Sequence, residues 1–313
     1  MESQINFNHI SVFYHEAVDA LDIKPDGIYF DCTGGGGGHS SLIASRLTTG
    51  HLYTIDRDPD AIKVLTERFS GNSNVTVVNS RFSRIKDILK EHGVEKADGI
   101  LADLGVSSYQ LDTGERGFSF HTDAPLDMRM SKEGLSAKDV VNTYSVQELT
   151  KIISAYGEEK FARNIASNIE RHRAEKEIET TLELAEIIKE AYPASVRRKS
   201  GHPARKTFQA IRIEVNSELE ELKNSLDDMF ECLSVGGRIA IITFHSLEDR
   251  IVKVKFNDFC SGCTCPPEFP VCVCGKTPKG KLAFKVKEPT EKETEENPRA
   301  RSAKLRAVER IAE

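Results

Sequence analysis

Five consecutive glycines, Gly34–Gly38, stand between an apolar segment and a stretch of small residues typical of a helix start. Glycine lets the backbone approach another group closely, although ordering it costs conformational entropy. Such a run inside a folded region therefore indicates a loop against a ligand. A flexible linker is the alternative, but linkers are usually longer and polar on both sides, whereas Ile28–Phe30 leads in here.

Two aspartates follow predicted strands in the same part of the chain. Asp56 ends the segment "HLYTID", where a carboxylate can accept hydrogen bonds from the ribose of an adenosine. Asp103 ends "ADGILAD", near the expected position of the reactive part of such a ligand. Carboxylates favour the sulfonium and ammonium groups of S-adenosylmethionine and repel a pyrophosphate. The structural alternatives are a surface turn for Asp56 and a turn cap for Asp103.

The glycine run does not complete the G-x-G-x-x-G fingerprint of dinucleotide sites. A pattern that starts at Gly34 has His39 in place of its third glycine, and one that starts at Gly35 has Ser40 there. An oxidoreductase that uses a dinucleotide therefore stays an alternative, with the fingerprint and Asp103 against it.

Five of the seven cysteines lie within "CSGCTCPPEFPVCVCG". Cys260-x2-Cys263 and Cys272-x-Cys274 could supply four thiolates to one tetrahedral zinc, with Cys265 left over. The first pair has zinc-like spacing, and the second is one residue tighter than usual. Free thiols on a surface loop, or disulfides formed on oxidation, are the alternatives.

Cations gather in one stretch of this acidic chain. Residues 196–213 contain lysine and arginine but no acid, which predicts contacts with nucleic-acid phosphates. A solvated surface run is the alternative. The cations are Arg197, Arg198, Lys199, Arg205, Lys206 and Arg212.

Alternating strands and helices must position these groups. The predicted strands are 27–33, 51–56, 75–78 and 97–104, and the predicted helices are 39–47, a segment that begins at Pro59, and 85–89. This alternation predicts an α/β fold with a parallel, doubly wound sheet. Ligands bind outside the carboxyl ends of such strands, where the glycine run, Asp56, Phe82 and Asp103 fall.

The pattern changes to helices after Asp103 and returns to a strand at Arg238–His245. Capping boxes begin at Ser145 and Thr180. We expect residues 288–298 to form a solvated connector and the last segment to form a strand or a short basic helix. The expected domains are a core of residues 1–108 and 205–313 and a helical insertion of residues 109–204.

Composition narrows the class of protein. A chain of 313 residues with 39% hydrophobic and 29% charged residues is typical of a soluble globular protein. No run of 18 apolar residues predicts a membrane span. The first ten residues lack a basic-then-apolar signal pattern, which predicts a cytoplasmic location. The net charge of −6 argues against broad non-specific nucleic-acid binding.

Long sequence blocks distinguish this chain from a generic doubly wound protein. They read "DCTGGGGGHS", "TIDRDPDAI", "ILADLGVSSYQLD", "ERGFSF", "PLDMRM", "YGEEKFA", "HPARKTFQAIRIEVNSELEEL", "GGRIAIITFHSLEDRIVK" and "ENPRARSAKLRAVER". Together they resemble the ribosomal RNA small subunit methyltransferase H family (MraW type) over almost the whole chain. The cysteine cluster is not part of that family's general pattern.

The resemblance implies a class I (Rossmann-like) methyltransferase sheet with a helical insertion for RNA. The implied reaction transfers methyl from S-adenosylmethionine to N4 of one cytidine in the decoding region of 16S ribosomal RNA. The implied partner is that RNA or the assembled small subunit, and a homodimer stays open. The implied cofactor contacts are Gly37, Gly38 and His39 in the loop, Asp56 at the ribose, Phe82 at the adenine, and Asp103 and Gln110 to complete the pocket.

The chemistry of that reaction assigns a catalytic role to Asp103. The N4 lone pair of cytosine is delocalised into the ring, so acceptors on its N–H groups are needed to align the amine. We expect Asp103 and a nearby backbone carbonyl to be these acceptors. The remaining alternative is a metal-dependent RNA-binding factor without catalysis, which would bind zinc and RNA but transfer no methyl.

Overall fold

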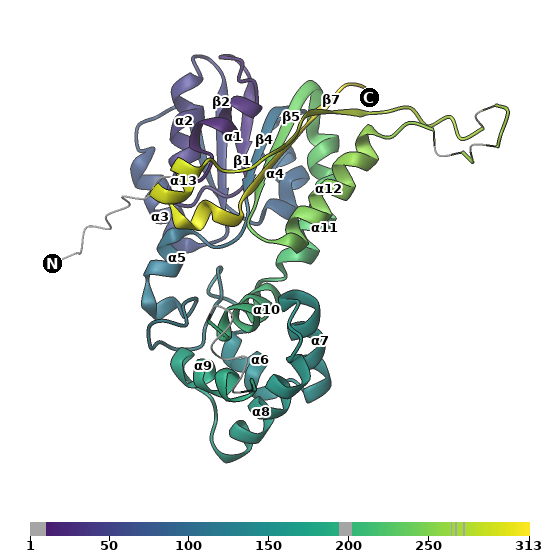
Figure 1. The fold of residues 1–313 in the computed structure, drawn as a ribbon. Coiled ribbons are helices and arrows are strands. Elements are labelled where there is room, and N and C mark those ends of the chain that lie inside the picture. The colour runs from purple at the N-terminus through teal and green to yellow at the C-terminus, as the bar shows by residue number, and fades with distance from the viewer. Residues whose placement is uncertain (1–10, 194–201, 264, 267, 272) are drawn as a thin grey trace. The chain divides into compact units, whose positions relative to one another are not determined.

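The computed structural model describes residues 11–193, 202–263, 265–266, 268–271 and 273–313 (Figure 1). The chain divides into two compact units. The first unit comprises Met1–Gly105 and Glu220–Glu313, and the second comprises Val106–Leu219. None of the helices in these described ranges combines the length and the apolar character that a membrane crossing needs.

A sheet of seven strands forms the centre of the described part of the first unit, in the order β3-β2-β1-β4-β5-β7-β6. Neighbours from β3 to β5 pair in parallel, whereas β7 is antiparallel to both β5 and β6. The strands are β1 Ile28–Asp31, β2 His51–Asp56, β3 Val75–Asn79, β4 Ala97–Asp103, β5 Leu233–Thr243, β6 Gly280–Lys287 and β7 Lys304–Arg310.

Helices cover both faces of this sheet because its central strands are apolar on both faces. Successive side chains point to opposite faces, so Phe30 and Ile100 pack in one core and Tyr29 and Leu101 in the other. The first core includes residues of α4 Ile85–Glu91, α11 Glu218–Cys232 and α12 Ser246–Cys260, and the second includes residues of α1 Tyr14–Ala20 and α2 Gly38–Arg46. Helix α3 Pro59–Arg68 packs against β2 and β3.

The described part of the second unit is helical and has its own core, which includes Leu149, Ile165 and Phe208. The capping box predicted at Ser145 forms at the start of α7. At Thr180 only half of the predicted box forms: Thr180 accepts from the backbone N–H of Glu183 at the start of α9, whereas the Glu183 side chain accepts from the backbone N–H of Glu179 (2.9 Å). The helices are α5 Ser108–Asp112, α6 Ala137–Thr143, α7 Val146–Gly157, α8 Ala162–Glu175, α9 Thr181–Glu190 and α10 Ala204–Asn216, with a 3₁₀ turn at Gly114–Arg116.

The second unit extends beyond residue 204, where the sequence pattern placed the end of the insertion. Helix α10 carries Phe208 and Ile211 into the core of this unit and packs mainly against α7. The unit therefore ends at Leu219. The sequence pattern missed this because the apolar stripe of α10 looks the same whichever core it joins.

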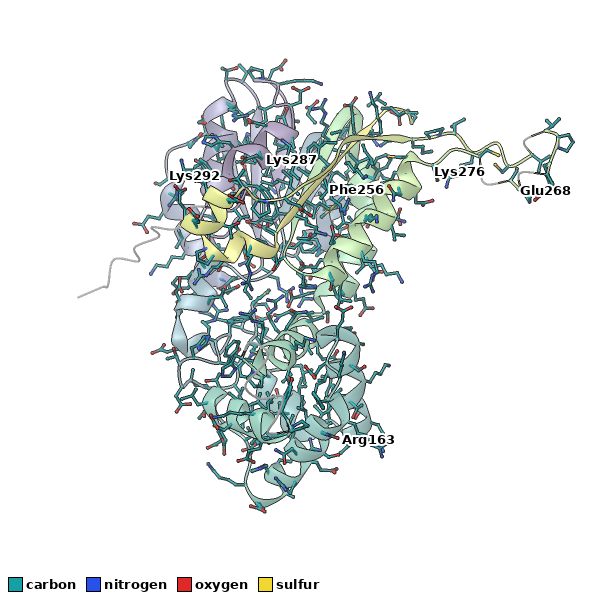
Figure 2. All side chains as sticks on the ribbon, viewed as in Figure 1. Arg163, Phe256, Glu268, Lys276, Lys287 and Lys292 are labelled. Carbon is teal, nitrogen blue, oxygen red and sulfur yellow. The ribbon has the colours of Figure 1, made fainter. Side chains whose placement is uncertain are left out.

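The last part of the chain also differs from the expectation in two places. Residues 288–298 are not only a connector, since they contain α13 Glu291–Glu296, which is followed by a 3₁₀ segment at Pro298–Ser302. Strand β6 was not predicted. Its exposed positions include Lys281, Lys285 and Lys287 and alternate with partly buried ones, as in a strand at the edge of a sheet. Lys287 and Lys292 mark strand β6 and helix α13 in Figure 2.

Candidate active site

The glycine loop joins β1 to α2 and lies on the carboxyl end of β2. The backbone N–H of Gly34 donates to the carbonyl of Ile55 (2.8 Å), and that of Gly37 donates to the carbonyl of Gly34 (2.7 Å). Gly35 and Gly37 have φ values of +51° and +81°, a left-handed conformation that favours glycine. The loop is therefore a tight turn that delivers the first turn of α2 to the edge of the sheet.

Close packing explains two of these glycines without a ligand. A Cβ atom at Gly34 would overlap Thr54 Oγ1 and lie 2.7 Å from Leu65 Cδ1. A Cβ atom at Gly38 would overlap Ser11 Oγ. The packing thus excludes a side chain at Gly34, where Thr54 and Leu65 are buried, whereas at Gly38 a side chain would require the end of Ser11 to turn away. The sequence pattern attributed both glycines to a ligand.

Asp56 fixes this loop from the end of β2. The backbone N–H of Gly35 donates to its Oδ2 and that of Asp58 to its Oδ1, both at 2.8 Å. Burial raises the pKa of Asp56 to about 6, and the two N–H donors oppose that rise. The carboxyl group is therefore poised between its neutral and ionised forms at the edge of the sheet.

Asp103, at the end of β4, carries an unsatisfied buried oxygen. Its backbone N–H donates to Thr33 Oγ1 (2.6 Å), which ties β4 to the start of the glycine loop. Within the described residues, Asp103 Oδ1 is buried and has no hydrogen-bond partner. Burial first, and then the charges of Asp31 and Glu248, raise the pKa of Asp103 well above its ordinary value. A buried acceptor without a partner is costly, so this oxygen suits a donor or a cation from a ligand.

His39 lies in the first turn of α2 and is buried. Its Nε2 is 3.1 Å from the carbonyl oxygen of Val12, and its Nδ1 is 3.7 Å from Asp103 Oδ2. Burial lowers the pKa of His39, which favours the neutral ring that donates through Nε2 to Val12. His39 therefore positions the N-terminal segment beside Asp103, and its contact with a cofactor stays a prediction.

Asp31, a buried acid at the end of β1, was missed by the sequence analysis. The hydroxyl of Ser40 donates to its Oδ2 (2.5 Å), and the backbone N–H of Thr33 lies 3.2 Å from its Oδ1. Burial raises its pKa as well. The predicted strand 27–33 ran two residues too far, so it placed Asp31 inside the strand, whereas β1 ends at Asp31 as β2 ends at Asp56 and β4 at Asp103. Carboxyl groups therefore follow β1, β2 and β4 at one edge, which suits a cationic ligand better than an anionic one.

Two other predicted cofactor residues lie in different surroundings. Phe82 begins the 3₁₀ turn Phe82–Arg84 after β3 and packs partly against the core of the first unit. Gln110 belongs to the second unit, where its side chain accepts from the backbone N–H of Ser107 (3.0 Å) and completes the cap of α5. Their roles at the adenine and in the pocket stay predictions.

The described cations of the basic stretch differ in whether their charges are exposed to a phosphate or already paired within the protein. Arg205 and Lys206 are exposed on α10, although Lys206 Nζ donates to the carbonyl of Glu158 (2.9 Å). Arg212 instead holds Glu218 in a two-pronged ion pair of 2.8 and 3.0 Å, so we no longer count it among the phosphate contacts. The other predicted cations, Arg197, Arg198 and Lys199, lie outside the described residues.

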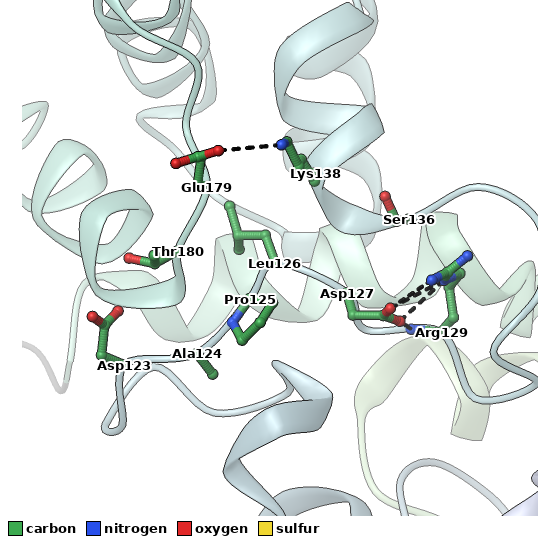
Figure 3. A pocket seen from close by; sticks show the side chains of 10 residues that line it. All are labelled: Asp123, Ala124, Pro125, Leu126, Asp127, Arg129, Ser136, Lys138, Glu179 and Thr180. Atoms are coloured by element: carbon green, nitrogen blue, oxygen red, sulfur yellow. Dashed lines mark hydrogen bonds and ion pairs between the residues drawn. The ribbon is translucent and has the colours of Figure 1, made fainter.

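A depression of about 630 Å³ in the second unit offers no substitute for these cations (Figure 3). Both of its cations pair with acids of the same lining: Arg129 with Asp127 at 2.7 Å, and Lys138 with Glu179 at 3.5 Å. The fifth charged residue of the lining, Asp123, is an acid. Charges paired in this way attract a phosphate weakly, so the depression does not resemble a nucleic-acid channel.

The cysteines that lie together in the structure are not the four that the sequence spacing predicted as zinc ligands. Cys263, Cys265 and Cys274 lie together, with their Sγ atoms all within 4.8 Å of one another. Cys260 instead ends α12 and packs partly against the core, while Cys272 lies outside the described residues. Cys265, which the spacing left over, thus joins the group in place of Cys260.

A sheet of this strand order, with one antiparallel strand, a glycine loop after β1 and acids at the strand ends, defines a class I (Rossmann-like) methyltransferase. The chain belongs to the MraW methylase family, because the sequence model of that family matches residues 6–311. This membership argues against both alternatives, the dinucleotide oxidoreductase and the non-catalytic RNA-binding factor.

Relatives of high similarity agree with the family. The chain is 54% identical to a ribosomal RNA small subunit methyltransferase H from Lachnospira eligens, covering 98% of this chain and 99% of the relative. It is 55% identical to a protein of the same name from Clostridium botulinum, covering 98% and 100%. A solved rRNA methylase from Streptococcus thermophilus aligns over 97% of this chain and 99% of that chain, with 11% identity and a TM-score of 0.43, a likeness too distant to add to the assignment.

Proposed function

We propose that this protein transfers a methyl group from S-adenosylmethionine to N4 of one cytidine in the decoding region of 16S ribosomal RNA. The observation that carries the proposal is the buried, unpartnered Oδ1 of Asp103 beside the glycine loop. Membership of a methylase family and the names of the relatives support the reaction and the RNA substrate.

The residues at this edge fit S-adenosylmethionine. Asp56 would accept from the ribose hydroxyls, and Phe82 would lie against the adenine. Gly37, Gly38 and His39 would face the cofactor from the loop, and Gln110 would complete its pocket. When bound, the cofactor supplies an electrophilic methyl group on a sulfonium cation. The positive charges of the sulfonium and ammonium groups would oppose the effect of burial on the pKa values of Asp31 and Asp103, so both carboxyl groups would be ionised beside the bound cofactor.

Asp103 would act on the substrate by accepting a hydrogen bond from the N4 amine. That bond holds the amine in one orientation and raises electron density on nitrogen, so its lone pair can point along the line of transfer. The backbone N–H of Asp103 donates to Thr33 Oγ1 (2.6 Å), so the backbone that carries the acceptor is anchored before the base arrives. A carbonyl in the turn after β4 would accept from the second N–H.

Exposed cations of the second unit would contact the RNA backbone. Arg205 and Lys206 belong to this set, together with Arg197, Arg198 and Lys199. Phosphate contacts orient an RNA without reading its sequence, so the choice of one cytidine must come from other contacts. The substrate is 16S ribosomal RNA, either free or in the assembled small subunit.

Isotope-labelled S-adenosylmethionine tests the proposal directly. The protein is incubated with free 16S ribosomal RNA and, separately, with small subunits that lack the modification, and the RNA is digested to nucleosides. We expect labelled N4-methylcytidine at one position. RNA with uridine at that position is the matched control, because uridine has no exocyclic amine and should gain no label. Label on a ring carbon or a ribose hydroxyl would contradict the role of Asp103.

A further inference from the structure

The segment between α12 and β6 is held together at its base. Lys276 Nζ donates to Asp258 Oδ1 (2.9 Å) and to Ser261 Oγ (3.0 Å). The backbone N–H of Lys279 donates to the carbonyl of Phe259 (3.0 Å). Figure 2 marks Lys276 and Glu268 on this segment, which extends away from the sheet in Figure 1. The outgoing and returning arms therefore start side by side, which brings cysteines from both arms together.

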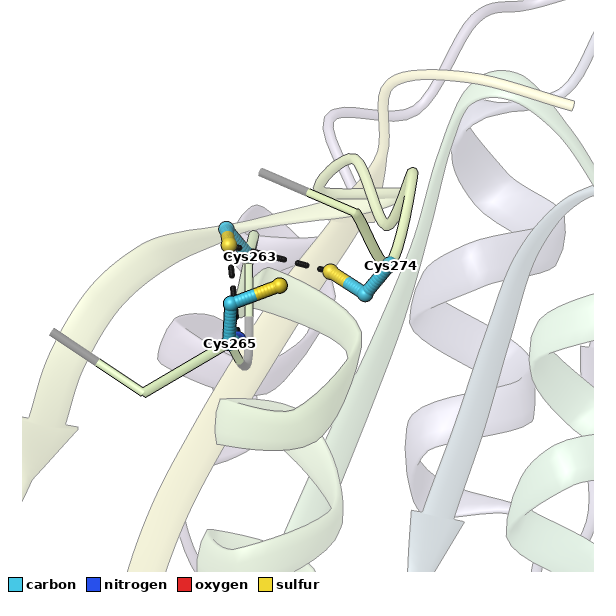
Figure 4. Close-up of side chains that lie close together, drawn as sticks. All are labelled: Cys263, Cys265 and Cys274. Carbon is cyan, nitrogen blue, oxygen red and sulfur yellow. Dashed lines mark hydrogen bonds between the residues drawn. The ribbon is translucent and has the colours of Figure 1, made fainter. Parts of the chain in front are cut away.

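Three thiols meet beyond this base (Figure 4). Cys263 and Cys265 come from the outgoing arm and Cys274 from the returning arm, and their Sγ atoms all lie within 4.8 Å of one another. Cys263 and Cys274 are 3.7 Å apart at sulfur. Two thiolates on one tetrahedral zinc, each about 2.3 Å from the metal, are about 3.8 Å apart. The distance between the Cys263 and Cys274 sulfurs is thus that of neighbouring ligands on one ion, and the Cys265 sulfur lies within 4.8 Å of both.

Backbone amides point at two of these sulfurs. The N–H of Cys265 donates to Cys263 Sγ, and the N–H of Val273 donates to Cys265 Sγ, each at 3.4 Å. Such donors stabilise the negative charge of a thiolate and orient it as a ligand. Cys263 and Cys274 are exposed, so an ion can reach the sulfurs from solvent.

We propose that Cys263, Cys265 and Cys274 bind one Zn²⁺ ion through three thiolates, in a structural site that joins the two arms of this segment. Soft sulfur ligands select zinc over magnesium or calcium. Each thiol that coordinates the ion gives up its proton to solvent, so binding strengthens as the pH rises. Cys272 lies outside the described residues and is assigned no role.

Metal analysis of the full chain tests this site. Protein purified under reducing conditions without chelator should contain about one zinc per chain. Cys263→Ser, Cys265→Ser and Cys274→Ser should each lower zinc retention against a competing chelator by at least about tenfold, since even the loss of a group that only supports a ligand costs about that much. Cys260→Ser is the matched control, because its thiol belongs to the same segment of sequence but not to the cluster, and this variant should keep its zinc.

A cobalt titration makes the test independent of purification history. Reduced, metal-free protein should bind Co²⁺ with strong thiolate-to-metal absorption in the near ultraviolet, and each of the three serine variants should weaken that band. Unchanged circular dichroism and S-adenosylmethionine affinity would show that the effect is local. Absence of both zinc and the cobalt band would overturn the proposal. So would a variant Cys260→Ser that loses zinc as readily as Cys265→Ser, or a disulfide between Cys263 and Cys274 in protein kept under reducing conditions.

Discussion

The pH dependence of cofactor binding is the sharpest test of the site, and it depends on Asp56. The pKa of this carboxyl is raised from 3.8 to about 6 by burial. That rise corresponds to about 3 kcal/mol of free energy in favour of the neutral form. Ribose hydroxyls donate best to the ionised carboxylate, and the cationic cofactor also favours it. Binding should therefore be coupled to the loss of a proton from Asp56.

The size of the effect follows from the ionised fraction. With a pKa of about 6, about 90% of Asp56 is ionised at pH 7 and about 10% at pH 5. Since only the ionised form is competent, the dissociation constant for S-adenosylmethionine should rise about tenfold from pH 7 to pH 5. Near pH 6, binding should release about half a proton per molecule.

Isothermal calorimetry measures both quantities. Affinity is recorded from pH 5 to pH 7, and the released proton is counted from the heats in two buffers of different ionisation enthalpy. Asp56→Asn should bind more weakly by about 1–3 kcal/mol, because it leaves buried hydroxyls poorly paired. Its affinity should also change less between pH 5 and pH 7 than that of the wild type, because only Asp31 and Asp103 are left to titrate beside the cofactor. Asp87→Asn, which neutralises an exposed carboxyl of the same unit, is the matched control and should behave as the wild type. A wild-type affinity that stays constant between pH 5 and pH 7 would refute the reasoning.

Three further predictions concern catalysis, stability and RNA binding. Asp103→Asn should fold normally but lower kcat about a hundredfold, in the range for a lost transition-state hydrogen bond, and a wild-type rate would remove Asp103 from the reaction. Arg57→Met should lower the free energy of unfolding in urea by about 3 kcal/mol, because it leaves the buried carboxylate of Glu221 without the guanidinium 2.8 Å away. Ser83 still donates to Glu221 in this variant, and a loss below about 1 kcal/mol would mean that this one hydrogen bond is enough to stabilise the carboxylate. Charge reversal of Arg205 and Lys206 to Glu should raise KM for RNA and flatten its salt dependence without changing cofactor affinity, whereas an unchanged salt slope would show that these side chains face away from the RNA.

Asp56 also predicts how the unliganded protein responds to acid. Its pKa is higher in the folded state than in the unfolded chain, so between about pH 4 and pH 6 the folded state binds more protons. The stability contributed by this group is therefore present below pH 4 and is lost as the pH rises through 6. Denaturant unfolding of Asp56→Asn should lack this loss, and a wild type and variant with parallel pH profiles would contradict the linkage.

The parallel strands β1 to β5 were predictable from local pattern because each of them carries its own apolar signal. His51–Asp56 matches its prediction at both ends, since an apolar strand stops at an acid before a proline-led helix. Strand β6 gave no such signal, because an edge strand alternates with lysine and follows a long irregular segment. Helix α10 could not be assigned to a unit, since its amphipathic pattern does not name the surface that it covers.

The positions of Asp56 and Asp103 followed from one rule, that parallel strands present their carboxyl ends at one edge. What the rule could not show is how each group is partnered. Arg212 looked free until the left-handed turn at Ser217 (φ 52°) carried Glu218 back to it. Cys260 was predicted as a metal ligand from its distance along the sequence to Cys263. The cluster instead depends on where the two arms of the segment come together in space, and Cys260 is not part of it.

Strand β7 has a consequence for how the sheet is built during synthesis. It follows β6 in the chain but lies between β5 and β6, so β6 has no neighbour in the sheet until β7 arrives. Likewise one edge of β4 has no partner until β5 is synthesised, after the whole of Val106–Leu219. The nascent chain therefore exposes unpaired strand edges for a long interval, which is when edge-to-edge aggregation is most favoured. The helical unit is one continuous segment of the chain, so it can complete its fold before the later strands of the sheet have been synthesised.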